Sequence, residues 1–198
     1  MENLNIEKKI QNENKLNNTK IINEIGEPIL MHNRSHIDFE QYELGNRNVS
    51  KEGANNFGFF FSDKVNLDHY GPFMRSRFLN IENPWDIRDL GPRTNYTDFR
   101  KKLLDLGIPN KDLAAYDLQV QDMIINRNKR LGSIDGLHSP GNNVALKEIR
   151  MATFNFFDAG SGFYLRKLLL LKNVDGIIFS DDSEMTVVAF NDAQIIKA

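Results

Sequence analysis

Gly58-Phe59-Phe60-Phe61-Ser62-Asp63 contains three consecutive phenylalanines between turn-forming residues. It follows a polar segment, residues 46–56, which predicts a loop. A short apolar run bounded by such residues is typical of a buried β-strand. Because aromatic side chains bury large areas, most of these rings are expected in the core, and one of them is a candidate for lining a pocket.

Short apolar runs elsewhere predict further strands on both sides of this one. Residues 29–31 form a strand candidate after Gly26 and Pro28, and His32 stands at its end. Residues 78–81 predict another strand, which Asn83-Pro84 should end because proline cannot donate to a β-ladder. Near the C-terminal end, apolar runs flank the turn-forming Asp181-Asp182-Ser183 and predict a hairpin made of residues 176–179 and 185–190.

Helical periodicity dominates the middle of the chain. Leucines and alanines at helical spacing over residues 97–131 predict two helices separated at residues 107–110. Further predictions are a loop at 132–143 and helices at 144–157 and 161–173. Strands at both ends with helices between them favour an α+β fold. We expect a polar tail or weakly amphipathic helix over residues 1–25 and one folded domain over residues 26–198.

Composition limits the classes of function. The 198 residues carry 25 Lys and Arg against 27 Asp and Glu, a net charge of −2, which removes the bulk electrostatic argument for a nucleic-acid or membrane-surface binder. No apolar run reaches the roughly 20 residues of a membrane helix, and the first residues lack a signal-peptide pattern. We therefore expect a cytoplasmic protein without membrane partners.

Metal and thiol chemistry are not predicted. The sequence has no cysteine, which excludes disulfides, thiolate zinc sites and a cysteine nucleophile. His32 and His36 have a metal-ligand spacing only on a helix, and their segment shows no helical signal, so they do not predict a zinc site even with His69 as a third ligand.

Five segments resemble, in order along the chain, the motifs of the ADP-ribosyltransferases found in phage and plasmid polyvalent proteins. The most specific is the phenylalanine stretch followed by Tyr70-Gly71, which is similar to that family's GxFFSxD…Y and to the GxYFAD…Y of poly-ADP-ribose polymerases. The other four are Gly26-Glu27-Pro28-Ile29-Leu30-Met31-His32 (GxPxxxYHGT), Phe78-Leu79-Asn80-Ile81-Glu82-Asn83-Pro84 (LxIxNP), Val174-Asp175-Gly176-Ile177-Ile178 (YDGII), and Val187-Val188-Ala189-Phe190 with Gln194, Ile195 and Lys197 (VVFxxxQIK).

The resemblance implies a split β-sheet core, in which two small sheets packed at an angle form a cleft for NAD, with residues about 97–157 as a helical insertion. The family's usual catalytic residues are His, Tyr and Glu from three strands. By resemblance, His32 bonds the adenosine-side ribose, Phe60 takes the place of the strand tyrosine, and Tyr70 is the second aromatic residue against the nicotinamide ring.

The third catalytic residue should be a carboxylate that stabilises positive charge on the nicotinamide ribose. Glu184 is the first candidate and Asp181 the alternative, although counting back from Phe190 places the family's Glu at Thr186 on the same strand face as Glu184. From residues alone, the acidic side chains at 181, 182 and 184 are equally typical of a solvated hairpin turn.

The resemblance also suggests which residues bind NAD. Gly58 would leave room for the nicotinamide amide, and Arg75, with Arg77 and Arg47 as further candidates, would meet the pyrophosphate. The full set of candidate NAD-binding residues is His32, Asn33, Arg34, Ser35, Gly58, Phe59, Phe60, Ser62, Tyr70 and Arg75.

The function implied is mono-ADP-ribosylation of a host macromolecule, in the cytoplasm of a cell that harbours a phage or mobile element, as counter-defence or host takeover. A host protein is the expected target, and nucleic acid stays open as a target. One alternative is a catalytically degenerate member that acts as a binding or inhibitor protein, because Asn33 stands where many members have Gly, Phe60 replaces Tyr, and Thr186 replaces Glu. The other alternative is an NAD glycohydrolase, in which water attacks instead of a target side chain.

Overall fold

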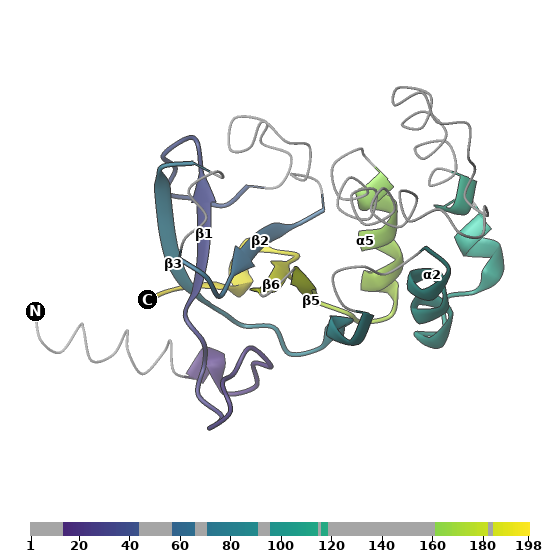
Figure 1. The fold of residues 1–198 in the computed structure, drawn as a ribbon, viewed down its shortest axis with the longest axis horizontal. Coiled ribbons are helices and arrows are strands. Elements are labelled where there is room, and N and C mark those ends of the chain that lie inside the picture. Colours follow the sequence, from purple (N-terminus) through teal and green to yellow (C-terminus); the bar gives the residue numbers. More distant parts are fainter. Residues whose placement is uncertain are drawn as a thin grey trace, which may run out of the picture.

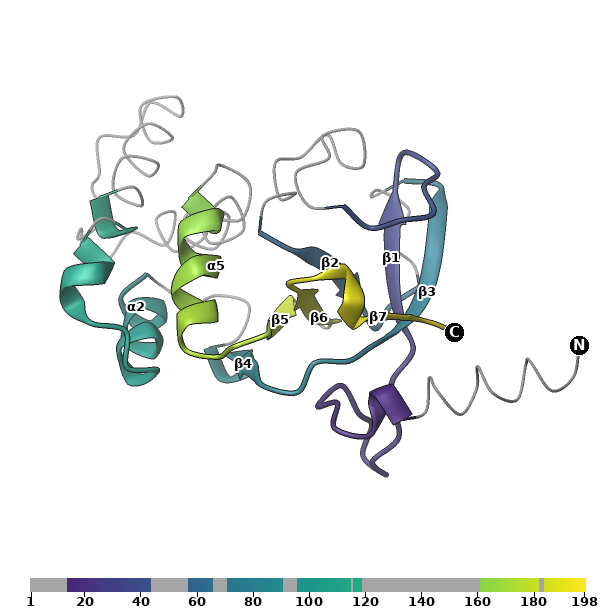
Figure 2. The same ribbon diagram turned by 180° about the vertical axis from the view of Figure 1, so that it is seen from behind.

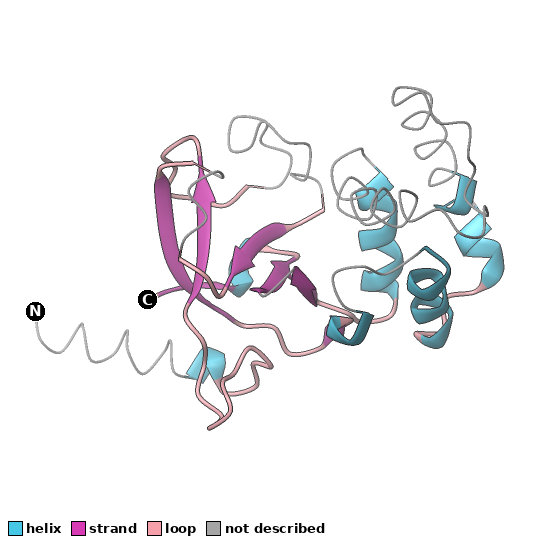
Figure 3. Cartoon of the chain, in the orientation of Figure 1, coloured by secondary structure: helices cyan, strands magenta, loops and turns pink. Residues whose placement is uncertain are grey.

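The computed structural model describes residues 14–43, 57–65, 71–90, 96–114, 116–118, 161–181 and 184–198, and shows a mixed α+β architecture (Figure 1). The predictions for residues 132–143 and 144–157, for His69 and for Tyr70 lie outside the described residues. Figure 3 shows the strands gathered in one part of the molecule and the two longer helices beside them.

The described strands form one hydrogen-bonded sheet of seven in the order β4-β5-β6-β2-β1-β3-β7. All neighbouring pairs are antiparallel except β4 and β5, which are parallel. The strands are β1 (Met31–Ser35), β2 (Phe59–Ser62), β3 (Phe73–Leu79), β4 (Pro84–Asp86), β5 (Gly176–Asp181), β6 (Glu184–Ala189) and β7 (Ile195–Lys197). The prediction of strands at both ends of the chain is confirmed.

The sheet is nearly divided between β1 and β2. Each of the other antiparallel neighbours is registered over at least three residue pairs, whereas β1 and β2 share the single pair His32 and Ser62. The half containing β1, β3 and β7 therefore joins the half containing β2, β6, β5 and β4 at one narrow junction, and β1 and β3 run in a different direction from β5 and β6 (Figure 1). The described strands thus form one continuous sheet that is constricted between β1 and β2.

Three strand predictions need correction. His32 is the second residue of β1 rather than the end of a strand, because the strand begins at Met31. β3 begins at Phe73 and ends at Leu79, earlier than expected. Pro84 opens β4 instead of ending a strand, which an edge strand tolerates because its outer side needs no N–H donor.

The predicted hairpin is confirmed, and its turn is tighter than expected. Asp181 and Glu184 are directly paired at its end, so both residues belong to the strands and not to the turn.

The helical region follows the predicted pattern as far as it is described. α2 (Tyr96–Asp105) and further helical residues at 110–114 and 116–118 flank Gly107, whose φ of 80° ends the first helix. α5 (Ser161–Leu171) matches the prediction for residues 161–173. Two short 3-10 helices, η3 (Arg88–Leu90) and η4 (Asp192–Gln194), complete the described elements. None of the helices in the described ranges is both long enough and apolar enough to cross a lipid bilayer.

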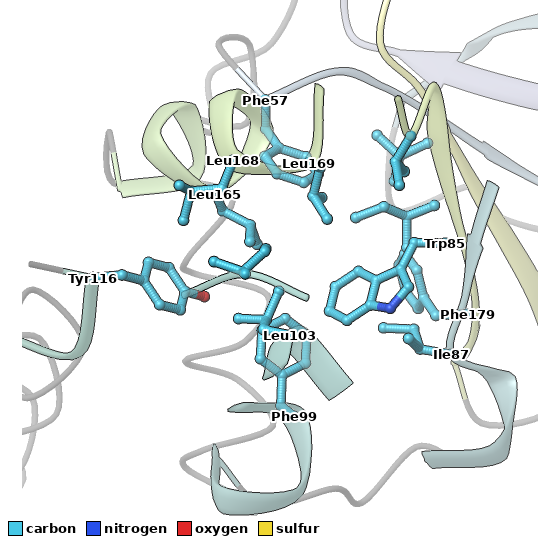
Figure 4. Packing of buried hydrophobic residues seen from close by; sticks show 14 of the residues in the cluster. Phe57, Trp85, Ile87, Phe99, Leu103, Tyr116, Leu165, Leu168, Leu169 and Phe179 are labelled. Carbon is cyan, nitrogen blue, oxygen red and sulfur yellow. The ribbon is translucent and has the colours of Figure 1, made fainter. Parts of the chain in front are cut away.

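The helices build a core with one half of the sheet. They lie together beside the β4 and β5 end, whereas β1 and β3 lie at the other end (Figures 1 and 2). Side chains from both groups meet in this core, with Trp85 edge-to-face against Phe99 at 5.2 Å and Leu103 fully buried (Figure 4). The described residues within 96–118 thus contribute side chains to this core.

The opposite face of the sheet has its own apolar cluster, which includes Phe59, Phe61 and Tyr42. The N-terminal residues contribute to it. Ile21 is buried there, and the Thr19 hydroxyl donates to the Leu79 carbonyl at 2.6 Å, so this segment is bound to the end of β3.

Candidate functional site

A row of polar side chains crosses four adjacent strands at the junction between the two halves of the sheet. Ser76 on β3 lies opposite His32 on β1, His32 lies opposite Ser62 on β2, and Ser62 lies opposite Thr186 on β6. Directly opposed residues on neighbouring strands project from the same face. We call Ser76, His32, Ser62 and Thr186 the polar row.

His32 is held by one partner in the polar row. Its Nδ1 lies 2.9 Å from the Ser76 hydroxyl oxygen, and both side chains are half-buried. Partial burial limits competition from water at Nδ1. The ring is thereby oriented by a neighbouring strand, as a ligand-binding imidazole requires.

Glu184 extends the polar row by a carboxylate. It lies two residues before Thr186 and thus on the same face of β6. The buried Ser62 hydroxyl donates to Glu184 Oε2 at 3.1 Å and accepts from the Lys64 N–H at 3.0 Å. Since Lys64 supplies its own hydrogen, the single hydroxyl hydrogen of Ser62 is directed to the carboxylate.

Asp63 fixes the junction of β2 and β6 beside that carboxylate. Its Oδ1 accepts from the Met185 N–H at 3.0 Å, and its own N–H donates to the Met185 carbonyl at 3.1 Å. The Ser62-Asp63 end of the phenylalanine stretch therefore positions the start of β6.

The three phenylalanines divide between the two faces. Phe60 lies opposite Val188 on the face of the polar row, is half-buried, and packs next to the helical core, with its ring 6.4 Å from that of Phe57. Phe59 points to the other face and packs against Tyr42 at 5.2 Å. The structure therefore brings Phe60, but not Phe59, to the polar row.

Gly58 has a packing role. A Cβ at this position would lie 2.6 Å from the Ala189 carbonyl oxygen and 2.6 Å from Val188 Cγ1. The space beside its Cα is thus filled by β6, which removes the room expected there for a nicotinamide amide.

Three candidate NAD-binding residues lie on the other side of β1 and β3. Asn33 and Ser35 alternate with His32 along β1, and Arg75 pairs with Asn33. Asn33 donates its amide to the Phe60 carbonyl at 2.8 Å, a second link across the β1–β2 junction. These side chains are not brought to the polar row.

Arg75 is committed to its own part of the structure. Its Nε donates to the Phe39 carbonyl at 2.7 Å, its guanidinium lies 3.9 Å from the Phe39 ring centroid, and it forms an ion pair with Asp38. These contacts, with the 8% exposure of Arg75, show a guanidinium that holds the segment after β1. Arg77 projects from the same face as Arg75, again opposite the polar row, and Arg47 lies outside the described residues.

Arg34 lies on the face of the polar row and holds the two residues that flank 66–70. Its Nε and Nη2 donate to the Val65 carbonyl at 3.2 and 3.0 Å, and its Nη1 donates to the Gly71 carbonyl at 3.3 Å. Gly71 has a φ of 120°, and a Cβ there would lie 2.2 Å from the Ser35 carbonyl oxygen. Arg34 thus links both Val65 and Gly71 to β1.

The remaining acidic candidate, Asp181, pairs with Glu184 in the hairpin register, and nothing is described of its side chain. Among the described residues, no three His, Asp or Glu side chains are arranged to hold a metal ion.

Three motif segments are joined to one another by structural hydrogen bonds. The Asp175 carboxylate accepts from the Glu82 and Asn83 N–H groups at 2.8 and 2.9 Å, which joins the YDGII-like and LxIxNP-like segments. Gln194 is buried, accepts from the Phe190 N–H at 2.8 Å and donates to the Asp175 carbonyl at 2.8 Å. The Asp175 carboxylate and the Gln194 side chain therefore hold the three segments together.

Sequence reasoning missed Ser76. Period-two alternation along Phe73–Leu79 places Ser76 between two arginines of the opposite face. The signal becomes useful only when the register of β3 against β1 is known, because that register places Ser76 beside His32.

Comparison with known proteins gives one structural likeness. No family model and no curated protein sequence matches the chain. A solved structure described as "Crystal structure of an anti-CRISPR protein" aligns with a TM-score of 0.33 and 11% sequence identity, over 82% of this chain and 90% of that one.

Proposed function

We propose that the protein is an ADP-ribosyltransferase that transfers ADP-ribose from NAD to a host macromolecule, with release of nicotinamide. The observation that supports this most is the polar row with Glu184, because it unites His32 and two candidate positions for the catalytic Glu, residues 184 and 186, on three adjacent strands. In the family that the sequence resembles, the catalytic residues come from three strands.

The position of the polar row within the sheet supports the proposal of a dinucleotide site. The resemblance predicts a cleft between two small sheets, and the polar row crosses the narrow junction of the two halves of this sheet. Imidazole, hydroxyl and carboxylate groups in one row provide the donors and acceptors that ribose hydroxyls need. Phe60 adds an aromatic surface at the edge of the row for a planar ring.

The proposed reaction breaks the C–N bond between nicotinamide and ribose, and the electron pair of that bond leaves with nicotinamide. The ribose becomes cationic and oxocarbenium-like before the nucleophile adds. The Glu184 carboxylate, oriented by Ser62, would stabilise that charge, and His32 would hold the dinucleotide in position. The nucleophile is a target side chain in transfer and water in hydrolysis.

The target is proposed to be a host protein, with nucleic acid as a second target class, in the setting of a phage or mobile element. This part of the proposal comes from the sequence resemblance.

A non-catalytic binding protein is the second candidate, and one set of observations favours it. Phe60 offers no hydroxyl, Thr186 stands in the polar row where the family has Glu, and the position after His32 carries Asn33, whose amide is bonded to the Phe60 carbonyl. A catalytically degenerate protein would keep the polar row and lack ADP-ribosyltransferase activity.

The deciding experiment incubates the full chain with adenylate-labelled NAD and host lysate. A discrete labelled macromolecule that disappears with His32→Ala supports transfer, whereas free ADP-ribose in place of the labelled band supports the glycohydrolase. Isothermal titration with NAD accompanies the assay. No heat at saturating NAD and no labelled product would refute the catalytic proposal and leave the binding protein.

A further inference from the structure

We infer that Ser76 is a positioning residue that donates to Nδ1 of His32, so that the imidazole carries its hydrogen on Nε2 and presents a donor to whatever occupies the face of the polar row. The expected effect on NAD binding rests on the proposed function, whereas the expected effect on the tautomer of the His32 ring does not.

The geometry of β1 and β3 supports the pairing. Ser76 and His32 are directly opposed in the register, and their side chains lie on one face with Oγ and Nδ1 2.9 Å apart. A hydroxyl contributes one hydrogen and can either donate to a neutral imidazole nitrogen or accept from a protonated one. The contact is therefore compatible with two tautomers, and the surroundings must select one.

The half-buried setting selects donation by Ser76. Within the described part of the chain, the Ser76 hydroxyl has no hydrogen-bond contact besides His32 Nδ1. If Nδ1 kept the hydrogen, Nδ1 would donate to the Ser76 oxygen, and the hydroxyl hydrogen would have no acceptor among the described residues. Donation to Nδ1 uses that hydrogen, and the ring hydrogen then stays on Nε2.

The tautomer of His32 determines which ligand groups can bind at each end of the polar row. His32 presents a donor at Nε2, and Glu184, one strand beyond Ser62, presents a carboxylate acceptor. A matching ligand therefore needs an acceptor oxygen facing His32 and a donor facing Glu184. A polyol with two hydroxyl groups satisfies both, and a carboxylate or phosphate facing Glu184 does not.

The test is a long-range nitrogen–proton NMR spectrum of the ¹⁵N-labelled full chain, which contains four histidines. His32→Gln identifies the His32 signals by their loss, and the exposed His36 serves as an internal reference for a solvated ring. We expect His32 with its hydrogen on Nε2 and with an Nδ1 resonance distinct from that of His36. Ser76→Ala should move that Nδ1 resonance to the His36 value, and Ser76→Thr should preserve it.

The matched control is Ser180→Ala, because Ser180 is another half-buried strand serine and lies on β5. It should leave the His32 signals unchanged. A hydrogen on Nδ1 of His32 in the wild-type protein would overturn the inference. An Nδ1 resonance that is the same in Ser76→Ala as in the wild type would overturn it too.

NAD titration separates this inference from the proposed function. We expect Ser76→Ala to weaken NAD binding roughly two- to tenfold, the range for loss of one orienting hydrogen bond, with little change in the rate at saturation. If neither the wild-type protein nor any variant binds NAD, the proposed function fails. The positioning role still stands in that case, provided that the Nδ1 resonance of His32 depends on Ser76. If NAD binds and Ser76→Ala leaves both its affinity and the His32 signals unchanged, the positioning role fails alone.

Discussion

Glu184→Gln is the substitution that tests the proposed chemistry most directly. Gln keeps the length of the side chain and an oxygen that can accept from Ser62, and it removes the negative charge. A hydrogen bond to a charged group contributes about 1.5 to 3 kcal/mol and one to a neutral group about 0.5 to 1.5, so the free energy of unfolding should fall by about 1 kcal/mol. The variant should therefore remain folded.

The effect on turnover should be much larger than the effect on folding. A carboxylate that faces a developing cation interacts more strongly with the transition state than with ground-state NAD. Removing one such electrostatic contact typically costs about 2.7 to 4 kcal/mol, or roughly a hundredfold to a thousandfold in rate. Initial rates of nicotinamide release over a range of NAD concentrations should show a lower kcat with a KM close to that of the wild type.

Asp181→Asn is the matched control, because Asp181 is paired with Glu184 at the end of the same hairpin. Wild-type turnover in the Glu184 variant together with an inactive Asp181 variant would show that the carboxylate was misassigned by three residues. If both variants keep full turnover, neither acid is the catalytic group, and the reasoning from the polar row is refuted.

Three further predictions concern stability. Leu103→Ala should lower the free energy of unfolding by about 2 to 5 kcal/mol in urea titrations, against a smaller loss for the half-buried Leu104, and equal small losses would show that α2 is not core. Gly71→Ala should cost at least about 2 kcal/mol, because of its φ of 120° and the Ser35 carbonyl, and an unchanged Tm would contradict this. Burial raises the pKa of Tyr42 to about 12, so between pH 10 and 12 the unfolded chain loses a proton that the folded chain keeps, and stability falls as the pH rises. Tyr42→Phe should flatten that fall in alkaline unfolding curves, and an unaltered curve would exclude this cause.

The strands and helices could be predicted wherever local signals agreed. The phenylalanine run, the acidic hairpin turn and the glycine break at 107 each combine an apolar pattern with a turn residue, and all three are confirmed. Strand β4 was missed because Pro84 normally argues against a strand, and only its place at the edge of the sheet makes it acceptable. That place depends on long-range pairing.

The candidate site could be predicted in part. His32, Phe60 and Glu184 were named from the sequence, and the register places them on one face. The sequence could not separate these from Asn33 or Arg75, because a shift of a strand by one residue exchanges its two faces. The register, with His32 opposite Ser62 and Asn33 opposite Arg75, shows which residues of β1 share the face of the polar row.

The pairing of β2 with β6 sets an order for folding. β2 ends at Ser62 and its partner begins at Glu184, so most of the chain must be synthesised before β2 receives its second neighbour. Until then the phenylalanine strand is an unpaired apolar edge, the kind of edge that recruits other chains. Contacts this distant in sequence also slow folding. The nascent chain should therefore need protection at residues 57–62, and the catalytic candidates meet only when the last hairpin docks.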